Sequence, residues 1–178
     1  MLRSLRPGIV MDVGAKQARY RSLVPATEYL TLDLRSDVGA DIVGDLHDVK
    51  RENASLDTVI ATEVLEHCQD PALVVGEIHR ILRQGGVCVL STRFIHPYHP
   101  DPHDYFRFSR DGLAYLFRDF SETRIIPLGN RVQSAWLMLP ERPRLLASLL
   151  GLLDPLVASY SRSERTRCPG GFLVRAVK

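Results

Sequence analysis

The fold is decided by the stretch Asp57-Thr-Val-Ile-Ala-Thr-Glu-Val-Leu-Glu-His67, which leads through Asp70-Pro71 into a segment ending at Gly85-Gly86. The run Thr58 to Thr62 is short and apolar, as expected of a buried strand. Asp70 and Pro71 supply the N-cap and first-turn proline of a helix that the two glycines end. The apolar residues on one face of this helix are Leu73, Val74, Ile78, Ile81 and Leu82. The stretch therefore predicts a strand followed by a helix.

Further strands are predicted on both sides of this unit. They are Ile9 to Val13, Tyr29 to Leu34, Asp41 to Val43 and Val87 to Leu90. The loop Gly14-Ala15-Lys16 precedes a short helix that Pro25 ends. Continuous apolar strands separated by crossovers are typical of a parallel sheet that is covered on both faces.

The last part of the chain predicts an antiparallel addition to this sheet. Ser109 caps a helix whose apolar face is Leu113, Leu116 and Phe117. The strand-like segments Thr123 to Leu128 and Gly171 to Val177 enclose a helical insertion at about residues 132–160. We therefore expect one domain over residues 1–178 of class α/β, a Rossmann-like mostly parallel sheet with helices on both faces and an antiparallel C-terminal edge strand.

Composition excludes several classes of protein. The 178 residues include 23 basic and 21 acidic side chains, a formal charge of +2, so a dedicated nucleic-acid binder is not expected. The 3 cysteines are far apart and none has zinc-site spacing, which favours a reducing cytoplasm over a disulfide framework. The first residues lack the apolar core of a signal peptide, so we expect a cytoplasmic protein.

Candidate ligand-binding residues follow from the rule that open α/β sheets bind ligands beyond the carboxyl ends of their strands. At these ends stand Asp12, Gly14, Ala15, Lys16, Tyr20, Asp33, Leu34, Asp45, Leu46, His47, Thr62 and Glu63. Asp33 lies 21 residues beyond Asp12, close to the spacing at which a carboxylate accepts both hydroxyl protons of a ribose. The alternative is that Asp33 only caps the turn that begins at Arg35.

Asp45 has a similar pair of interpretations. Its carboxylate is placed to accept a hydrogen bond from the exocyclic amine of adenine, with Leu46 packed against the ring. Alternatively, Asp45 is a loop aspartate that hydrogen-bonds its own backbone.

The run from Asp57 to His67, followed by Asp70-Pro71 and Glu77-Ile-His-Arg-Ile-Leu-Arg-Gln-Gly-Gly86, resembles the central motif of class I S-adenosylmethionine-dependent methyltransferases of the bacterial type-11-like group. Gln84 stands where proline is usual in that motif. The resemblance extends from about Ile9 to Leu128. It implies a Rossmann-like sheet, S-adenosylmethionine as the methyl donor, and cofactor contacts near Thr62, Glu63 and His67.

The segment from His96 to Ser109 is similar to a P-H-D-Y-(W/F)-R-F-(T/S) stretch of bacterial members associated with polysaccharide or secondary-metabolite pathways. Because it follows the strand Val87 to Leu90, we expect it to lie over the site, above a small-molecule acceptor. His99 or His103 is a candidate general base, with Asp104 orienting the imidazole. Alternatively, His103 and Asp104 only fix the loop, while Tyr105, Phe106 and Phe108 pack under it. The interleaved prolines disfavour a metal site built from His96, His99 and His103.

The first loop favours a second hypothesis. Only Gly14 remains of the family's glycine-rich form, Lys16 takes the place of the second glycine, and about eight residues precede the first strand. A degenerate, non-catalytic relative that binds a nucleoside or a partner protein has these features. The enzyme hypothesis is methyl transfer to a small O or N nucleophile.

The insertion is rich in leucine from Arg144 to Val157 and is too short to span a membrane. Core or lid packing is its expected role. Homodimerisation, an apolar substrate wall and binding to a membrane surface are the alternatives.

Overall fold

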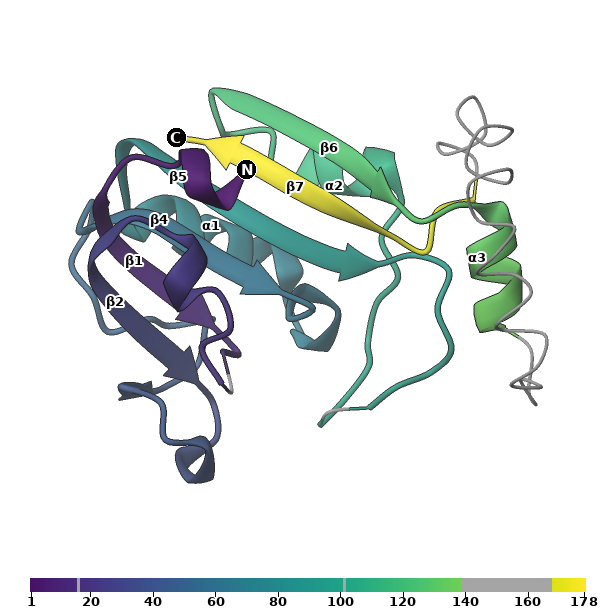
Figure 1. Cartoon of the computed structure of the whole chain (residues 1–178), viewed down its shortest axis with the longest axis horizontal. Coiled ribbons are helices and arrows are strands. Elements are labelled where there is room, and N and C mark those ends of the chain that lie inside the picture. Colours follow the sequence, from purple (N-terminus) through teal and green to yellow (C-terminus); the bar gives the residue numbers. More distant parts are fainter. Residues whose placement is uncertain (16, 101, 139–167) are drawn as a thin grey trace.

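A mixed sheet of seven strands forms the centre of the protein (Figure 1). The computed structural model describes residues 1–15, 17–100, 102–138 and 168–178. The strands are β1 (Gly8–Val13), β2 (Ala26–Asp33), β3 (Ile42–Val43), β4 (Leu56–Thr62), β5 (Leu82–Arg93), β6 (Glu122–Leu128) and β7 (Gly171–Val177). Their order is β3-β2-β1-β4-β5-β7-β6, and β1 to β5 pair in parallel. The strand order therefore reverses between β1 and β4, where open α/β sheets bind ligands.

Side chains alternate between the two faces of the sheet and form two apolar clusters. Met11, Val59 and Leu90 belong to the larger cluster, which helices α1 (Pro71–Ile81) and α2 (Arg110–Leu116) cover. Their neighbours in sequence, such as Val10 and Ile60, belong to the smaller cluster. Figure 1 shows α1 and α2 behind the sheet, and the 3-10 turn η1 (Leu2–Ser4) in front of it. Among the described residues, α1 and α2 thus pack on one face of the sheet and the turn η1 on the other.

Helix α1 begins as the sequence predicts. The Asp70 carboxylate accepts hydrogen bonds from the backbone N–H groups of Ala72 and Leu73, and Pro71 occupies the first turn. The helix ends at Ile81, before the predicted stop at Gly85-Gly86. The reason is that Leu82 is already extended and pairs with Leu56 of β4, so the two glycines lie within β5. Gly85 has a φ of 77°, which bends the strand there.

Helix α2 confirms its predicted cap and face. The Ser109 hydroxyl accepts a hydrogen bond from the backbone N–H of Gly112, and Leu113 and Phe117 are buried in the larger cluster. The last predicted strands are also present. β7 pairs antiparallel with both β5 and β6, so the C-terminal strand is antiparallel but internal, and β6 forms the edge.

Two predicted helical segments differ or lie largely outside the described residues. Between β1 and β2 the structure has the 3-10 turn η2 (Arg21–Leu23) in place of a short helix, because Ala18, with a φ of 47°, lies outside the helical conformation. Of the insertion, α3 (Arg131–Leu137) is described, and the Leu-rich stretch lies outside the described residues. Two further 3-10 turns are η3 (Ser36–Val38) and η4 (Leu65–His67). Within the described residues, no helix is long and apolar enough to cross a membrane.

Candidate active site

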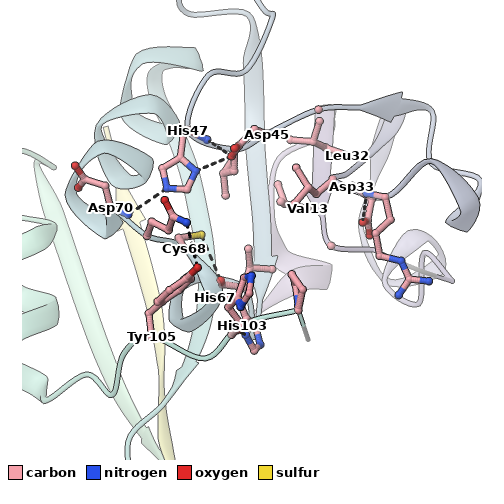
Figure 2. Close-up of a pocket in the computed structure, with 18 of the residues that line it drawn as sticks. Val13, Leu32, Asp33, Asp45, His47, His67, Cys68, Asp70, His103 and Tyr105 are labelled. Carbon is pink, nitrogen blue, oxygen red and sulfur yellow. Dashed lines mark hydrogen bonds and ion pairs between the residues drawn. The ribbon is translucent and has the colours of Figure 1, made fainter. Parts of the chain in front are cut away.

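A cavity of about 510 Å³ opens at the carboxyl ends of β1, β2, β3 and β4 (Figure 2). This volume lies in the range of small-molecule sites. The predicted residues that line it are Gly14, Asp33, Leu34, Asp45, Leu46, His47, Glu63, His67 and His103. The strand-end rule therefore brings together residues that are up to 89 positions apart in the sequence, from Gly14 to His103.

Several predicted residues do not line this cavity. Asp12 is buried beneath it in β1, and Thr62 is the last residue of β4. Ala15 and Tyr20 follow the first loop, and Tyr20 packs against the smaller apolar cluster. His99 and Asp104 lie in the loop that follows β5. Lys16 is outside the described residues.

Gly14 has a backbone conformation that requires glycine. Its φ is +65°, and a Cβ built there would lie 2.9 Å from Cγ2 of Val64. The N–H of Gly14 donates to the carbonyl of Leu32 at 2.8 Å, which fixes the turn at the end of β1. A side chain would therefore meet both backbone strain and the cavity wall. This glycine keeps the wall open at the first loop.

Asp33 ends β2 and is 8% exposed. One carboxylate oxygen accepts the backbone N–H of Arg35 at 3.0 Å, which is the turn contact expected from the alternative interpretation. A carboxylate can accept several hydrogen bonds, so this one does not exclude a ligand hydroxyl. Asp33 also lines the cavity, and Figure 2 shows it beside Val13 and Leu32. The turn and the ribose interpretations are thus compatible.

Asp45 belongs to a chain of hydrogen bonds that joins the loop after β3 to helix α1. Its carboxylate accepts the backbone N–H of His47 at 2.9 Å and lies 2.6 Å from Nδ1 of the same ring. The N–H of Asp70 donates to Nε2 of His47 at 3.2 Å, which leaves the ring proton on Nδ1. Burial alone would raise the pKa of Asp45, but the bonds from His47 outweigh it and hold the pKa below its usual value. Asp45 therefore presents a carboxylate at neutral pH.

Asp12 is a buried carboxyl group under the first loop. It is 1% exposed, and the Tyr29 hydroxyl donates to its Oδ2 at 2.6 Å. Its Oδ1 is buried without a hydrogen-bond partner in the described structure. Burial raises the pKa of this carboxyl despite the bond from Tyr29 and the nearby charge of Arg21. Asp12 is thus joined through Tyr29 to the neighbouring strand β2.

Glu63 follows β4 with a φ of 56°, which is uncommon for a residue with a side chain. The Ser91 hydroxyl donates to one carboxylate oxygen at 2.7 Å, and Arg93 forms an ion pair with the other. The N–H of Glu63 donates to the carbonyl of Ser91 at 2.9 Å. Such strain persists where surrounding contacts impose it, and it is common at functional sites. Glu63 therefore forms a fixed wall of the cavity.

The loop between β5 and α2 folds back over the cavity, as the sequence predicts. The N–H groups of Tyr105 and Phe106 both donate to the carbonyl of Glu66 in η4. This contact places Pro102, His103 and Tyr105 on the cavity wall. Phe108 is buried as expected, but Tyr105 and Phe106 are 42% and 38% exposed, because their N–H groups hold the loop at the surface of η4.

Within this loop, Asp104 contacts His99. The sequence had left open whether Asp104 orients His99 or His103. The Asp104 carboxylate accepts the N–H of His99 at 2.9 Å and lies 3.4 Å from Nδ1 of the ring. Arg107 forms ion-paired hydrogen bonds to both oxygens of Asp104 and holds the pKa of that carboxyl well below its usual range. His103 instead faces the cavity, with its ring 5.4 Å from that of Tyr105.

Sequence reasoning missed part of the cavity wall. These residues are Val13, Leu32, Arg35, Gly44, Val64, Cys68, Gln69, Asp70, Leu73, Pro102 and Tyr105. Most adjoin a predicted residue, so extending each strand end by one position would have found them. Gln69, Asp70 and Leu73 adjoin no predicted residue. Cys68 adjoins His67 and is buried. Burial raises its pKa to about 12, so the cavity wall presents a thiol and no thiolate nucleophile at neutral pH.

A family model described as a methyltransferase domain matches residues 12–90, which hold the first loop, the strand ends and helix α1. Residues 12–90 therefore match a methyltransferase domain, which supports the predicted class I S-adenosylmethionine-dependent methyltransferase family. This is a family of enzymes whose methyl donor is S-adenosylmethionine. The predicted fold class and the predicted family are both confirmed.

Curated relatives of this chain match it over short segments. A Mycolicibacterium smegmatis protein named "Probable S-adenosylmethionine-dependent methyltransferase" is 43% identical over 49 residues, which are 28% of this chain and 19% of the relative. A ubiquinone biosynthesis O-methyltransferase of Psychrobacter cryohalolentis is 53% identical over 36 residues, 20% of this chain and 14% of the relative. The chain thus matches less than a fifth of the length of either relative.

A solved structure extends the likeness of the fold to nearly the whole chain. A crystal structure of an S-adenosylmethionine-dependent methyltransferase from Archaeoglobus fulgidus has a TM-score of 0.65 and 14% sequence identity. The alignment covers 99% of this chain and 88% of that one. At this identity the comparison establishes a common methyltransferase fold.

The cavity of this chain fits the adenosyl part of S-adenosylmethionine. Asp33 offers a carboxylate for the ribose hydroxyls, and Gly14 leaves the space that a Cβ would fill. Apolar side chains suited to the faces of an adenine ring line the same space: Val13, Leu32, Leu46 and Leu73. The donor set and the volume therefore agree with the family's cofactor.

Proposed function

We propose that this chain transfers a methyl group from S-adenosylmethionine to an oxygen or nitrogen of a small-molecule acceptor. The observation that carries the proposal is the cavity at the strand switch point, where the Asp33 carboxylate and the Gly14 turn face the same space. When bound, the cofactor supplies a methyl group on a positively charged sulfur.

The chain's own residues have distinct tasks in this proposal. Asp33 binds the ribose hydroxyls, while Asp45 and Leu46 hold the adenine. Glu63, held by Arg93 and Ser91, and His67 form the wall between cofactor and acceptor. The loop from His96 to Phe108 covers the acceptor, excludes water and orients the nucleophile.

The test of cofactor binding is calorimetry with S-adenosylmethionine and S-adenosylhomocysteine on the wild-type chain and Asp33→Asn. The asparagine oxygen can still accept the Arg35 N–H, so the turn survives, but the amide cannot accept a second ribose proton. We expect affinity to fall about 10-fold or more, since hydrogen bonds to charged groups contribute about 1.5–3 kcal/mol. Asp48→Ala is the matched control, because Asp48 is an exposed carboxylate paired with Lys50 outside the cavity. Equal affinity in Asp33→Asn and wild type contradicts the ribose contact.

We propose His103 as the general base that takes a proton from the acceptor, because it is the member of the candidate set His99, His103 and Asp104 that lines the cavity. Asp104 positions the loop through His99 and Arg107. His103→Asn should bind S-adenosylhomocysteine like wild type and lose about 100-fold in turnover once an acceptor is in hand. Unchanged turnover would mean that the acceptor is nucleophilic enough without a base, and that His103 is not a catalytic residue.

A non-catalytic relative that only binds a nucleoside is the second candidate function. The shortened glycine loop favours it. It predicts that adenosine and S-adenosylmethionine bind equally well, because no residue would recognise the methionine part. A clear preference for S-adenosylmethionine over adenosine rules it out.

A further inference from the structure

A buried carboxylate oxygen without a partner lies beneath the loop that covers the cavity. Glu66 in η4 is 0% exposed, and the Thr92 hydroxyl donates to its Oε2 at 2.8 Å. Its Oε1 has no hydrogen-bond partner in the described structure. An unpaired buried carboxylate is costly, so the site favours a proton or a cation at Oε1.

Two imidazoles converge on this oxygen. Nε2 of His99 lies 4.0 Å from Oε1 of Glu66, and the rings of His67 and His99 meet edge to face with centroids 5.0 Å apart. One donor atom from each of Glu66, His67 and His99 lies within 4.8 Å of the other two. The cluster thus presents two imidazole nitrogens and one carboxyl group.

The remaining ring nitrogens of both histidines face acceptors. Nδ1 of His67 contacts the carbonyl of His103, and Nδ1 of His99 faces the Asp104 carboxylate at 3.4 Å. Histidines that bind metals characteristically donate their second N–H to a carbonyl or carboxylate. This arrangement leaves Nε2 of each ring as the nitrogen that would bind an ion, and Nε2 of His99 faces the Glu66 oxygen. Arg107 neutralises Asp104, and Arg93 neutralises Glu63, so neither carboxylate competes for a cation.

We propose that Glu66, His67 and His99 bind a divalent transition-metal ion, with zinc as the test ion. Two imidazoles and one carboxylate form a ligand set used for zinc and for non-haem iron. Metal–ligand distances of about 2.0–2.2 Å require the donor atoms to close to roughly 3.3 Å from one another. That closure is a side-chain adjustment, because Glu66 and His67 are adjacent and the His99 ring is part-exposed.

The ion would stand at the wall of the cavity, because His67 belongs to both. Three protein ligands leave coordination positions open. Resting on the proposed methyl transfer, this role identifies the acceptor class as a hydroxyl compound. Its oxygen would bind the ion, which would lower the pKa of the hydroxyl, and its proton would pass to His103, the base proposed above. His96 stacks on His99 with ring centroids 4.5 Å apart, so it packs beside the cluster.

The test is a zinc titration of the whole chain after removal of metals with a chelator. Wild type should bind one zinc ion, and Co²⁺ in its place should give the visible absorption of a site with imidazole ligands. Glu66→Gln and His99→Asn should each weaken zinc at least 100-fold. His79→Asn is the matched control. His79 lies in α1 and packs against Phe120, away from the cluster, so this variant should leave zinc affinity unchanged.

Circular dichroism of each metal-free variant checks that it is folded, and Glu66→Gln should fold because it removes an unpaired buried charge. Absence of zinc binding by wild type, or equal zinc affinity in wild type and both variants, overturns the site. S-adenosylhomocysteine binding is measured on the same metal-free sample. Cofactor binding without zinc binding defeats this inference alone, whereas zinc binding without cofactor binding defeats the proposed function alone.

Discussion

The two walls of the cavity are built in different ways. On the cofactor side, Gly14, Asp33 and Asp45 act through backbone conformation and short turns at the ends of β1, β2 and β3. On the loop side, the wall is backed by Glu66, His99 and Asp104, which do not line the cavity themselves: Glu66 faces His99, 33 residues away, and His99 contacts Asp104. The difference teaches that the cofactor side depends on local backbone turns, whereas the loop side depends on several long-range contacts that must all be present together.

The largest effect should come from the loop side, in Arg107→Ala. Asp104 has a side chain that is 1% exposed, and the variant leaves it buried without its cation. We expect a loss of about 3 kcal/mol in the free energy of unfolding at pH 7, measured by urea denaturation. Arg110→Ala, an exposed arginine at the start of α2, is the control and should change it by less than about 0.5 kcal/mol.

The same variant has a predictable pH dependence. Arg107 lowers the pKa of folded Asp104, so the pair stabilises the native state above the unfolded aspartate pKa of about 4. This stabilisation falls as the pH drops from there towards the lower folded-state pKa. The difference between wild type and Arg107→Ala should therefore shrink below about pH 4. A difference that is constant with pH contradicts the assigned ion pair.

A smaller effect on stability, but a larger one on binding, should come from the cofactor side in Gly14→Ala. A side chain at a φ of +65° costs about 1–2 kcal/mol, and its Cβ would lie 2.9 Å from Val64 at the cavity wall. We expect affinity for S-adenosylhomocysteine to fall about 10-fold in calorimetry. Gly39→Ala is matched in backbone, with a φ of +72°, but its Cβ would meet nothing within 4 Å. Equal losses of affinity in both variants would show that Gly14 acts only through the stability of the fold.

Much of this comparison was readable in the sequence. The strand ends at Asp33 and Asp45, the cap at Asp70 and the cap at Ser109 are local patterns, and the structure has them where predicted. The predicted end of α1 was wrong, because Leu82 pairs with Leu56 of β4 and the helix therefore ends before Gly85-Gly86. Local sequence carries no information about such a pairing.

The loop side was harder to predict for the same reason. Glu66 lies in the E-H pair of the motif, yet it was not a candidate, because its partners Thr92 and His99 are 26 and 33 residues away. Asp104 was expected to orient a histidine, but spacing alone did not distinguish His99 from His103. The fold decides it by returning the loop to the carbonyl of Glu66.

The most direct test of the central claim is a crystal structure of the whole chain with S-adenosylhomocysteine. The account predicts the ligand in the cavity at the ends of β1, β2 and β3, with its ribose hydroxyls on Asp33 and its adenine beside Asp45 and Leu46. A ligand bound elsewhere, or one whose ribose makes no contact with Asp33, would contradict it.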